Sequence, residues 1–184
     1  AQGSLFITLE LVALASLVLG MGLPVTASYI VLATLSAPLI YDLISQSALL
    51  DAILIGIQAG DLPNNVAATL SLFGGDPLIA LQEMPLEMKQ LIRQEMLPAE
   101  LLTGMLLSAH LIIFWLSQDS NVTPPVCLAS FAAAGIAGTN PMATGLTSWK
   151  VAKGLYLVPI LFAYSPLISG GWPERIEVFI WSCM

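Results

Sequence analysis

Residues 101–138 form one long apolar stretch that is interrupted by the polar decapeptide SQDSNVTPPV, Ser117 to Val126. A helix of about 20 mostly apolar residues is long enough to cross the hydrocarbon core of a bilayer. Unwound backbone at that depth is tolerated only where protein or a watery cavity surrounds it, because its polar groups would otherwise have no partners. The sequence therefore predicts a discontinuous transmembrane helix over residues 99–140, broken at a TPP motif.

The composition favours a membrane protein. Of the 184 residues, 57% are hydrophobic and 9% are charged, whereas about a quarter of the residues of a soluble domain are charged. Aspartate and glutamate together number 12 against 5 for lysine and arginine, which argues against a nucleic-acid partner. We therefore expect an all-α membrane protein surrounded by a lipid bilayer.

A helical hairpin is predicted over residues 1–42. Its two apolar runs, LFITLELVALASLVL and ASYIVLATLSAPLI, are separated by GMGLP, Gly20 to Pro24. Glycine permits unusual backbone angles and proline breaks the helical ladder, so GMGLP indicates a turn or an unwound tip. Each run is short for a full crossing, and we expect a hairpin that dips into the membrane. A single helix kinked at Pro24 is the alternative.

Residues 43–98 are expected to form an acidic extramembrane insert. The turn signals GDLPNN and GGDP occur within it. The segment PLEMKQLIRQEML alternates apolar and charged residues at helical spacing, which predicts an amphipathic helix that lies on a surface or caps a core, with most of its charges on a solvated face. The acidic residues of this region are Asp51, Asp61, Asp76, Glu83, Glu87 and Glu95.

The remaining segments are a loop and transmembrane helix over 141–171 and the start of a further, truncated segment over 172–184. Both ends of the chain lie in apolar runs, so we expect it to be a piece of a larger membrane protein. Lys150 and Lys153 are the only basic pair beside a membrane segment, and the positive-inside rule places their loop in the cytoplasm. Counting back across one span places the insert, residues 43–98, on the periplasmic side.

The prolines of the decapeptide release backbone carbonyls. Pro125 cannot donate to the carbonyl of Asn121, and Pro124 leaves that of Ser120 without its helical partner. Carbonyl and side-chain oxygens together are hard ligands that suit a small hard cation. The side chains that could contribute oxygens are those of Ser117, Asp119, Ser120, Asn121 and Thr123.

The GMGLP segment, with Thr26 and Ser28 just beyond it, is a second discontinuous element. Two such elements in one membrane segment indicate the substrate and ion site of a secondary transporter. An acid such as Asp119 within a membrane segment is a functional candidate by default; the alternative is that it caps a helix end near the interface. His110 is interpreted as a hydrogen-bonding residue that faces the bundle.

Three segments closely resemble the C-terminal part of the large membrane subunit of tripartite ATP-independent periplasmic (TRAP) transporters. They are GMGLPVTASYIVLATLSAPLI, AHLIIFWLSQDSNVTPPVCLASFAAAGIAGTNPMATG and VPILFAYSPLI. Within that family they look most like the fused permeases that work with TAXI-type binding proteins. The resemblance covers Leu5 to about Tyr41 and about Pro98 to Gly170.

The resemblance implies a sodium-coupled importer of organic acids in the bacterial inner membrane. It implies an elevator-type fold built from inverted repeats, of which this chain carries one, and therefore no complete transport pathway in the chain alone. The implied partners are a TAXI-type periplasmic substrate-binding protein, a small membrane subunit or its fused equivalent, and the missing parts of the same permease. Na⁺ is the coupling ion, and no other cofactor is expected.

Carried over to this sequence, the family's sodium site falls on the hairpin tip and the broken helix. The tip contributes Gly20, Met21, Gly22, Leu23 and Pro24. The broken helix contributes Asn121, Thr123, Pro124 and Pro125. We expect Thr26, Ser28 and Asp119 to lie close to the substrate.

Residues 43–95 are longer than the connection expected in the family, and they are a candidate docking surface for the binding protein or a lid.

Two other functions are considered. An intramembrane aspartyl hydrolase would need Glu10 or Asp42 as a second carboxylate beside Asp119, and neither lies in a convincing partner motif. We therefore expect no enzyme. An accessory membrane subunit without transport activity of its own is the remaining alternative.

Overall fold

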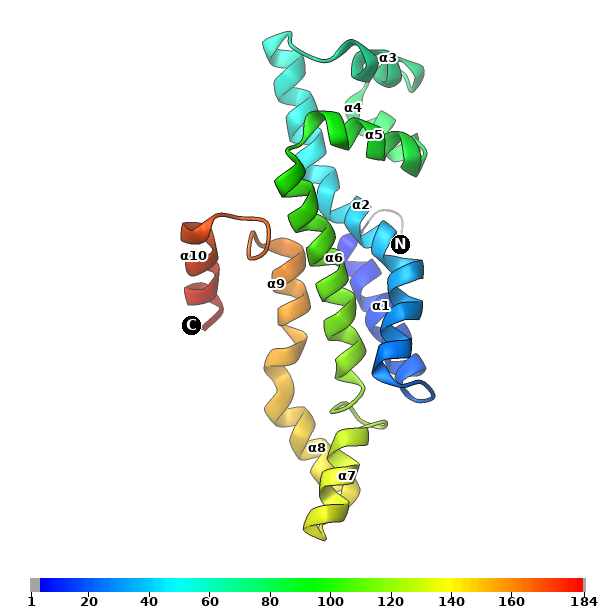
Figure 1. The fold of residues 1–184 in the computed structure, drawn as a ribbon, viewed down its shortest axis with the longest axis vertical. Helices are drawn as coiled ribbons and strands as arrows, with labels where there is room; N and C mark the ends of the chain where they lie inside the picture. The colour runs from blue at the N-terminus through cyan, green and yellow to red at the C-terminus, as the bar shows by residue number, and fades with distance from the viewer. Residues whose placement is uncertain (1–3, 184) are drawn as a thin grey trace.

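A computed structural model describes residues 4–183 of the protein, and this part of the chain is all-helical (Figure 1). The helices are α1 (Leu5–Gly20), α2 (Val25–Ala59), α3 (Asn64–Leu72), α4 (Pro77–Glu83), α5 (Leu86–Met96), α6 (Ala99–Asp119), α7 (Leu128–Ala137), α8 (Pro141–Val151), the 3-10 helix η1 (Ala152–Tyr156), α9 (Val158–Tyr164) and α10 (Trp172–Cys183).

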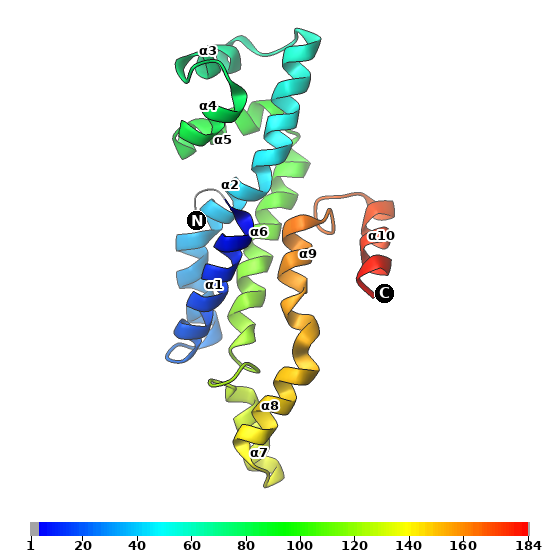
Figure 2. The same cartoon turned by 180° about the vertical axis from the view of Figure 1, so that it is seen from behind.

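The centre of the molecule is a bundle in which α6 packs against α1 and α2 on one side and against α9 on the other (Figures 1 and 2). Tyr29 of α2 is joined to α6 by a hydrogen bond, with 3.1 Å between its hydroxyl oxygen and Nδ1 of His110, so the prediction that His110 faces the bundle is confirmed. Close side-chain packing of this kind holds membrane helices together. The buried core consists of Leu9, Val12, Leu32, Ala37, Ile40, Ala109, Ile112, Ile113 and Leu116.

Helices α2 and α6 are each long and apolar enough to cross a membrane. At about 1.5 Å per residue, the 35 residues of α2 measure about 52 Å, more than a hydrocarbon core of about 30 Å requires even at a tilt of 40°. Several large apolar side chains point away from the core, among them Leu35, which is 75% exposed. An exposed apolar surface of this kind suits lipid or further membrane helices.

The expected boundary between hairpin and insert at residue 42 falls inside α2, which continues to Ala59. The second arm of the hairpin is therefore not short, contrary to expectation. The reason is visible in the sequence LISQSALLDAILIGI, residues 43–57, which contains one charged residue and no proline. Nothing in this stretch stops a helix until Gly60, whose left-handed conformation ends α2.

Helices α3, α4 and α5 form a small layer against the C-terminal part of α2 and the start of α6 (Figure 1). The turn signal GGDP leads into α4, as expected. Its Asp76 caps the helix, because the carboxylate accepts a hydrogen bond of 2.8 Å from the N–H of Leu78. A second buried cluster holds the layer to α2. It comprises Leu49, Ile53, Val66, Leu70, Ala80, Leu81, Met84, Ile92 and Leu97.

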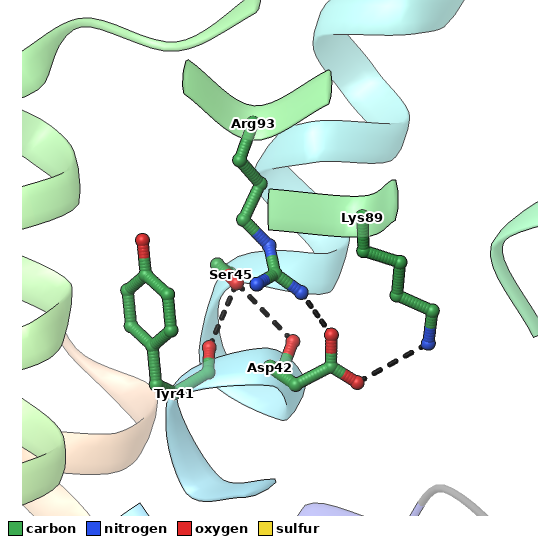
Figure 3. Close-up of polar contacts among 5 residues, drawn as sticks. All are labelled: Tyr41, Asp42, Ser45, Lys89 and Arg93. Atoms are coloured by element: carbon green, nitrogen blue, oxygen red, sulfur yellow. Dashed lines mark hydrogen bonds and ion pairs between the residues drawn. The ribbon is translucent and has the colours of Figure 1, made fainter. Parts of the chain in front are cut away.

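A buried ion network also joins this layer to α2 (Figure 3). Arg93 of α5 donates a hydrogen bond to Asp42, and the ammonium of Lys89 lies 3.2 Å from the other oxygen of the same carboxylate. The Arg93 side chain is 1% exposed, and its guanidinium lies 5.1 Å from the centre of the Tyr41 ring. Most charges of α5 were expected to face solvent; Lys89 and Arg93 do not, because both turn towards Asp42.

Replacing Asp42 with asparagine should release the α3–α5 layer. Removing one partner of a buried ion pair costs about 3–5 kcal/mol, which raises the population of open states by at least on the order of 100-fold. Lys89 and Arg93 are the only tryptic sites between residues 1 and 149. Limited trypsin digestion followed by mass spectrometry should therefore show rapid cleavage after both residues in Asp42→Asn and slow cleavage in the wild type.

The matched control for this experiment is Asp51→Asn, because Asp51 is an exposed acid on the same helix. It should leave the digestion rate unchanged. Equal protection of Lys89 and Arg93 in the wild type and in Asp42→Asn would contradict a structural role for the network.

Candidate functional site

The first element of the site is the tip of the α1–α2 hairpin. Met21 follows the end of α1, and the N–H groups of Gly22 and Leu23 both bond to the carbonyl of Leu19, at 3.1 and 2.9 Å. The carbonyl of Gly20 has no helical partner, because the residue four positions on is Pro24. Within residues 4–183, no backbone N–H bonds to the carbonyls of Gly20, Met21 or Gly22. The tip therefore presents free backbone oxygens.

The second element is the break between α6 and α7. Helix α6 ends at Asp119, and the chain turns through Ser120 to Cys127 before α7 begins. The N–H groups of Asn121 and Thr123 bond back to Gln118 and Asp119, at 3.0 and 2.9 Å. In the described chain, no backbone N–H bonds to the carbonyls of Ser120 or Asn121. The predicted interruption of the helix is thus present. The two carbonyls that the prolines were expected to release, those of Ser120 and Asn121, are free in this part of the chain.

These two interruptions touch each other at Gly20. A Cβ atom added to Gly20 would collide with the Ser120 side chain, so the backbone of the hairpin tip lies directly against the break. One turn earlier in α1, the Ser16 hydroxyl donates a hydrogen bond of 2.8 Å to the carbonyl of Leu116 in α6. The structure therefore brings together two motifs that lie about a hundred residues apart in the sequence.

Thr123 is fixed within the break by two contacts. Its hydroxyl bonds to the carbonyl of Asp119 and lies 2.7 Å from the hydroxyl of Tyr156 in η1. Tyr156 was not a candidate from the sequence, because the segment KGLYLVP around it carries no motif that marks a site. Its contact ties the broken helix to the α8–α9 segment.

Asp119 lies at the end of α6 and is 4% exposed. Its Oδ1 atom is buried without a hydrogen-bond partner among the described residues. The residue lines a cavity of 350 Å³ between α1, α6, η1 and α9, to which Glu10 and Tyr156 also contribute. Asp119 is the last residue of α6 and not the residue before α7, which is Cys127, so it lies at a helix C-terminus.

Thr26 and Ser28 lie in the first turn of α2, next to the hairpin tip. The Thr26 side chain is exposed, whereas Ser28 is fully buried and its hydroxyl has no partner in the described chain. Asp42, the other acid considered beside Asp119, is held in the ion network with Arg93 and Lys89.

A second hollow of 660 Å³ lies beside the break at Val122 and extends along α8. No charged side chain lines it, and its polar groups are hydroxyls and one amide. These belong to Thr139, Asn140, Thr144, Thr147 and Ser148. Sequence reasoning did not single out these residues, because hydroxyls spaced along a helix carry no specific signal until the fold places them on one groove.

The fold and the two facing interruptions define a membrane transport component. The family model of the DctM component of tripartite ATP-independent periplasmic transporters matches residues 1–168. The chain therefore belongs to this family, the large membrane component of TRAP transporters. The family is one of transporters and not of enzymes, and its tripartite assembly includes a binding protein and a small subunit. The matched range includes about residues 42–97, which the resemblance had left out.

No curated protein and no solved structure matches the chain.

Substituting alanine for Gly20 should separate the hairpin tip from the break. The new Cβ would meet Ser120, and overpacking of this kind costs about 1–3 kcal/mol. Thermal unfolding of the purified protein in detergent should show a lower midpoint for Gly20→Ala, and Ser120→Gly in the same chain should restore much of the loss.

Gly22→Ala is the control, because nothing lies within 4 Å of a Cβ at Gly22. Its unfolding midpoint should match that of the wild type. Strictly additive effects of Gly20→Ala and Ser120→Gly in a double-mutant cycle would show that the two residues are not in contact.

Proposed function

We propose that the chain forms part of a sodium-coupled TRAP permease that imports organic acids delivered by a periplasmic binding protein. The observation that carries this proposal is the contact between two interrupted elements, the hairpin tip and the break after α6, each with free backbone carbonyls. Paired interruptions at membrane depth are the usual setting for substrate and coupling ion in secondary transporters.

The sodium ion would be held by oxygens from both elements. Carbonyl oxygens are hard, neutral ligands, and several of them can surround a monovalent cation without an excess of negative charge. On the hairpin side the ligands belong to Gly20, Met21, Gly22 and Pro24. On the other side they belong to Asn121, Thr123, Pro124 and Pro125, with the Thr123 hydroxyl already positioned by Tyr156.

The substrate would lie beside the ion, in the hollow between the break and α8. This hollow offers hydroxyl and amide groups and no acid, which suits a carboxylate. Thr26 and Ser28, at the start of α2 next to the hairpin tip, are our further candidates close to the substrate, because a helix N-terminus favours an anion. Asp119 faces a different cavity, and we therefore no longer place it against an anionic substrate.

The orientation follows from the positions of the charged ends. The α3–α5 layer and α8, which carries Lys150, lie at opposite ends of α6 (Figure 1). If α8 is cytoplasmic by the positive-inside rule, the layer faces the periplasm of a bacterial inner membrane. Its basic residues, Lys89 and Arg93, are turned inwards onto Asp42, which leaves an acidic outer face. This face is our candidate docking surface, or a lid, for a TAXI-type binding protein. A small subunit, separate or fused, and a second inverted repeat would complete the permease.

Thr123→Val tests the proposed ion site. In the full permease reconstituted with its binding protein, loss of one oxygen ligand should raise the Na⁺ concentration for half-maximal uptake about 10-fold, a change of about 1.4 kcal/mol. Thr123→Ser keeps the hydroxyl and should stay near the wild type. Tyr156→Phe keeps the ligand but removes its hydroxyl partner, so its effect should be smaller.

Unchanged sodium dependence in Thr123→Val would place the ion elsewhere. A permease that takes up substrate equally well without this chain would instead favour the alternative, an accessory membrane subunit.

A further inference from the structure

We propose that the cavity between α1, α6, η1 and α9 binds a small organic cation, a primary amine with an apolar body, through Asp119. This site is separate from the proposed sodium and substrate site and does not rest on it.

The first observation is the state of the Asp119 carboxylate. Its Oδ1 atom is buried and has no hydrogen-bond partner in residues 4–183. Burial of a charge without a partner is costly, particularly within a membrane segment. A donor that carries positive charge would offset this cost.

The described part of the protein does not supply that donor. The chain has five basic residues, and none lines the cavity. Lys89 and Arg93 are committed to Asp42, and Arg175 donates to the carbonyls of Ile168 and Gly170. Lys150 and Lys153 lie on α8 and η1, outside the residues that form the cavity wall. The described residues therefore leave room for a ligand that carries the counter-charge.

The oxygen groups of the cavity match an ammonium group. Asp119, Glu10 and Tyr156 place two carboxylates and one hydroxyl on the wall, and an ammonium has three N–H donors. Ca²⁺ and Mg²⁺ take about six or more oxygen ligands. Within residues 4–183, no group of three or more acidic, histidine or cysteine residues could hold a metal ion. The set is thus too sparse for a metal and sufficient for an amine.

The remaining residues of the cavity wall determine which kind of ligand, apart from its ammonium group, fits the cavity. Apart from the three oxygen-bearing residues, the lining is apolar, and a volume of 350 Å³ lies at the lower end of typical small-molecule sites. Phe6 adds an aromatic ring that can attract a cation. The lining residues that would contact an apolar body are Phe6, Leu9, Ala13, Leu17 and Ile160.

Binding of a ligand in this cavity would restrain the break between α6 and α7. The backbone carbonyl of Asp119 accepts hydrogen bonds from the N–H and hydroxyl groups of Thr123, and Tyr156 both lines the cavity and contacts Thr123. A bound amine would bridge α1, α6 and η1 and so restrain the segment that includes Thr123.

The test uses 2-phenylethylamine and its neutral counterpart 2-phenylethanol, each titrated against the purified protein in lipid nanodiscs at pH 7. Calorimetry should show saturable binding of the amine at least 10-fold tighter than that of the alcohol. Empty nanodiscs measure partition into lipid and should give no saturable heat. Equal affinities of amine and alcohol, or amine heats matched by empty nanodiscs, would overturn the proposal.

Variants locate the site. Asp119→Asn should weaken amine binding at least 10-fold. Glu10→Gln, at an exposed position, should weaken it less and serves if Asp119→Asn does not fold. Ile160→Trp should block the cavity, and Glu177→Gln, an exposed acid on α10, should have no effect. Wild-type affinity in both Asp119→Asn and Glu10→Gln would show that the amine binds elsewhere.

Discussion

The close contact between Gly20 and Ser120 is the constraint on which the site depends. Backbone carbonyls that have lost their helical partners are costly in a low-dielectric environment unless protein covers them. The fold packs the two interruptions against each other at Gly20 and Ser120, while Met21 to Pro24 of the tip stay exposed. Glycine is required on one side of this contact because any side chain would hold the two backbones apart.

The fold distributes its charge unevenly along the bundle. At one end, Asp42 pairs with both Lys89 and Arg93 in a buried network that fastens a layer of short helices to α2. At the other end, the break exposes uncharged oxygens, and the buried Oδ1 of Asp119 has no hydrogen-bond partner among the described residues. The first end is therefore suited to holding a fixed structure, and the second to exchanging ligands.

Local sequence signals predicted the hairpin tip and the helix break, because GMGLP and TPP act on the backbone of their own neighbours. They did not predict the ion network, since Asp42 and Arg93 are 51 residues apart and neither has a local motif. The same is true of the contact between Thr123 and Tyr156. The length of α2 was missed for a different reason: the polar residues of 43–59 were read as the start of an insert, although no helix-stopping residue occurs there until the chain reaches Gly60.

Helix α2 joins the hairpin tip to the layer of short helices without a break. A rod of about 52 Å that rotates by about 5° around one end moves its other end by about 4.5 Å. A rotation of a few degrees at the layer would therefore displace the tip by several ångströms if α2 stayed straight, and Pro38 is the point along the helix where bending is easiest.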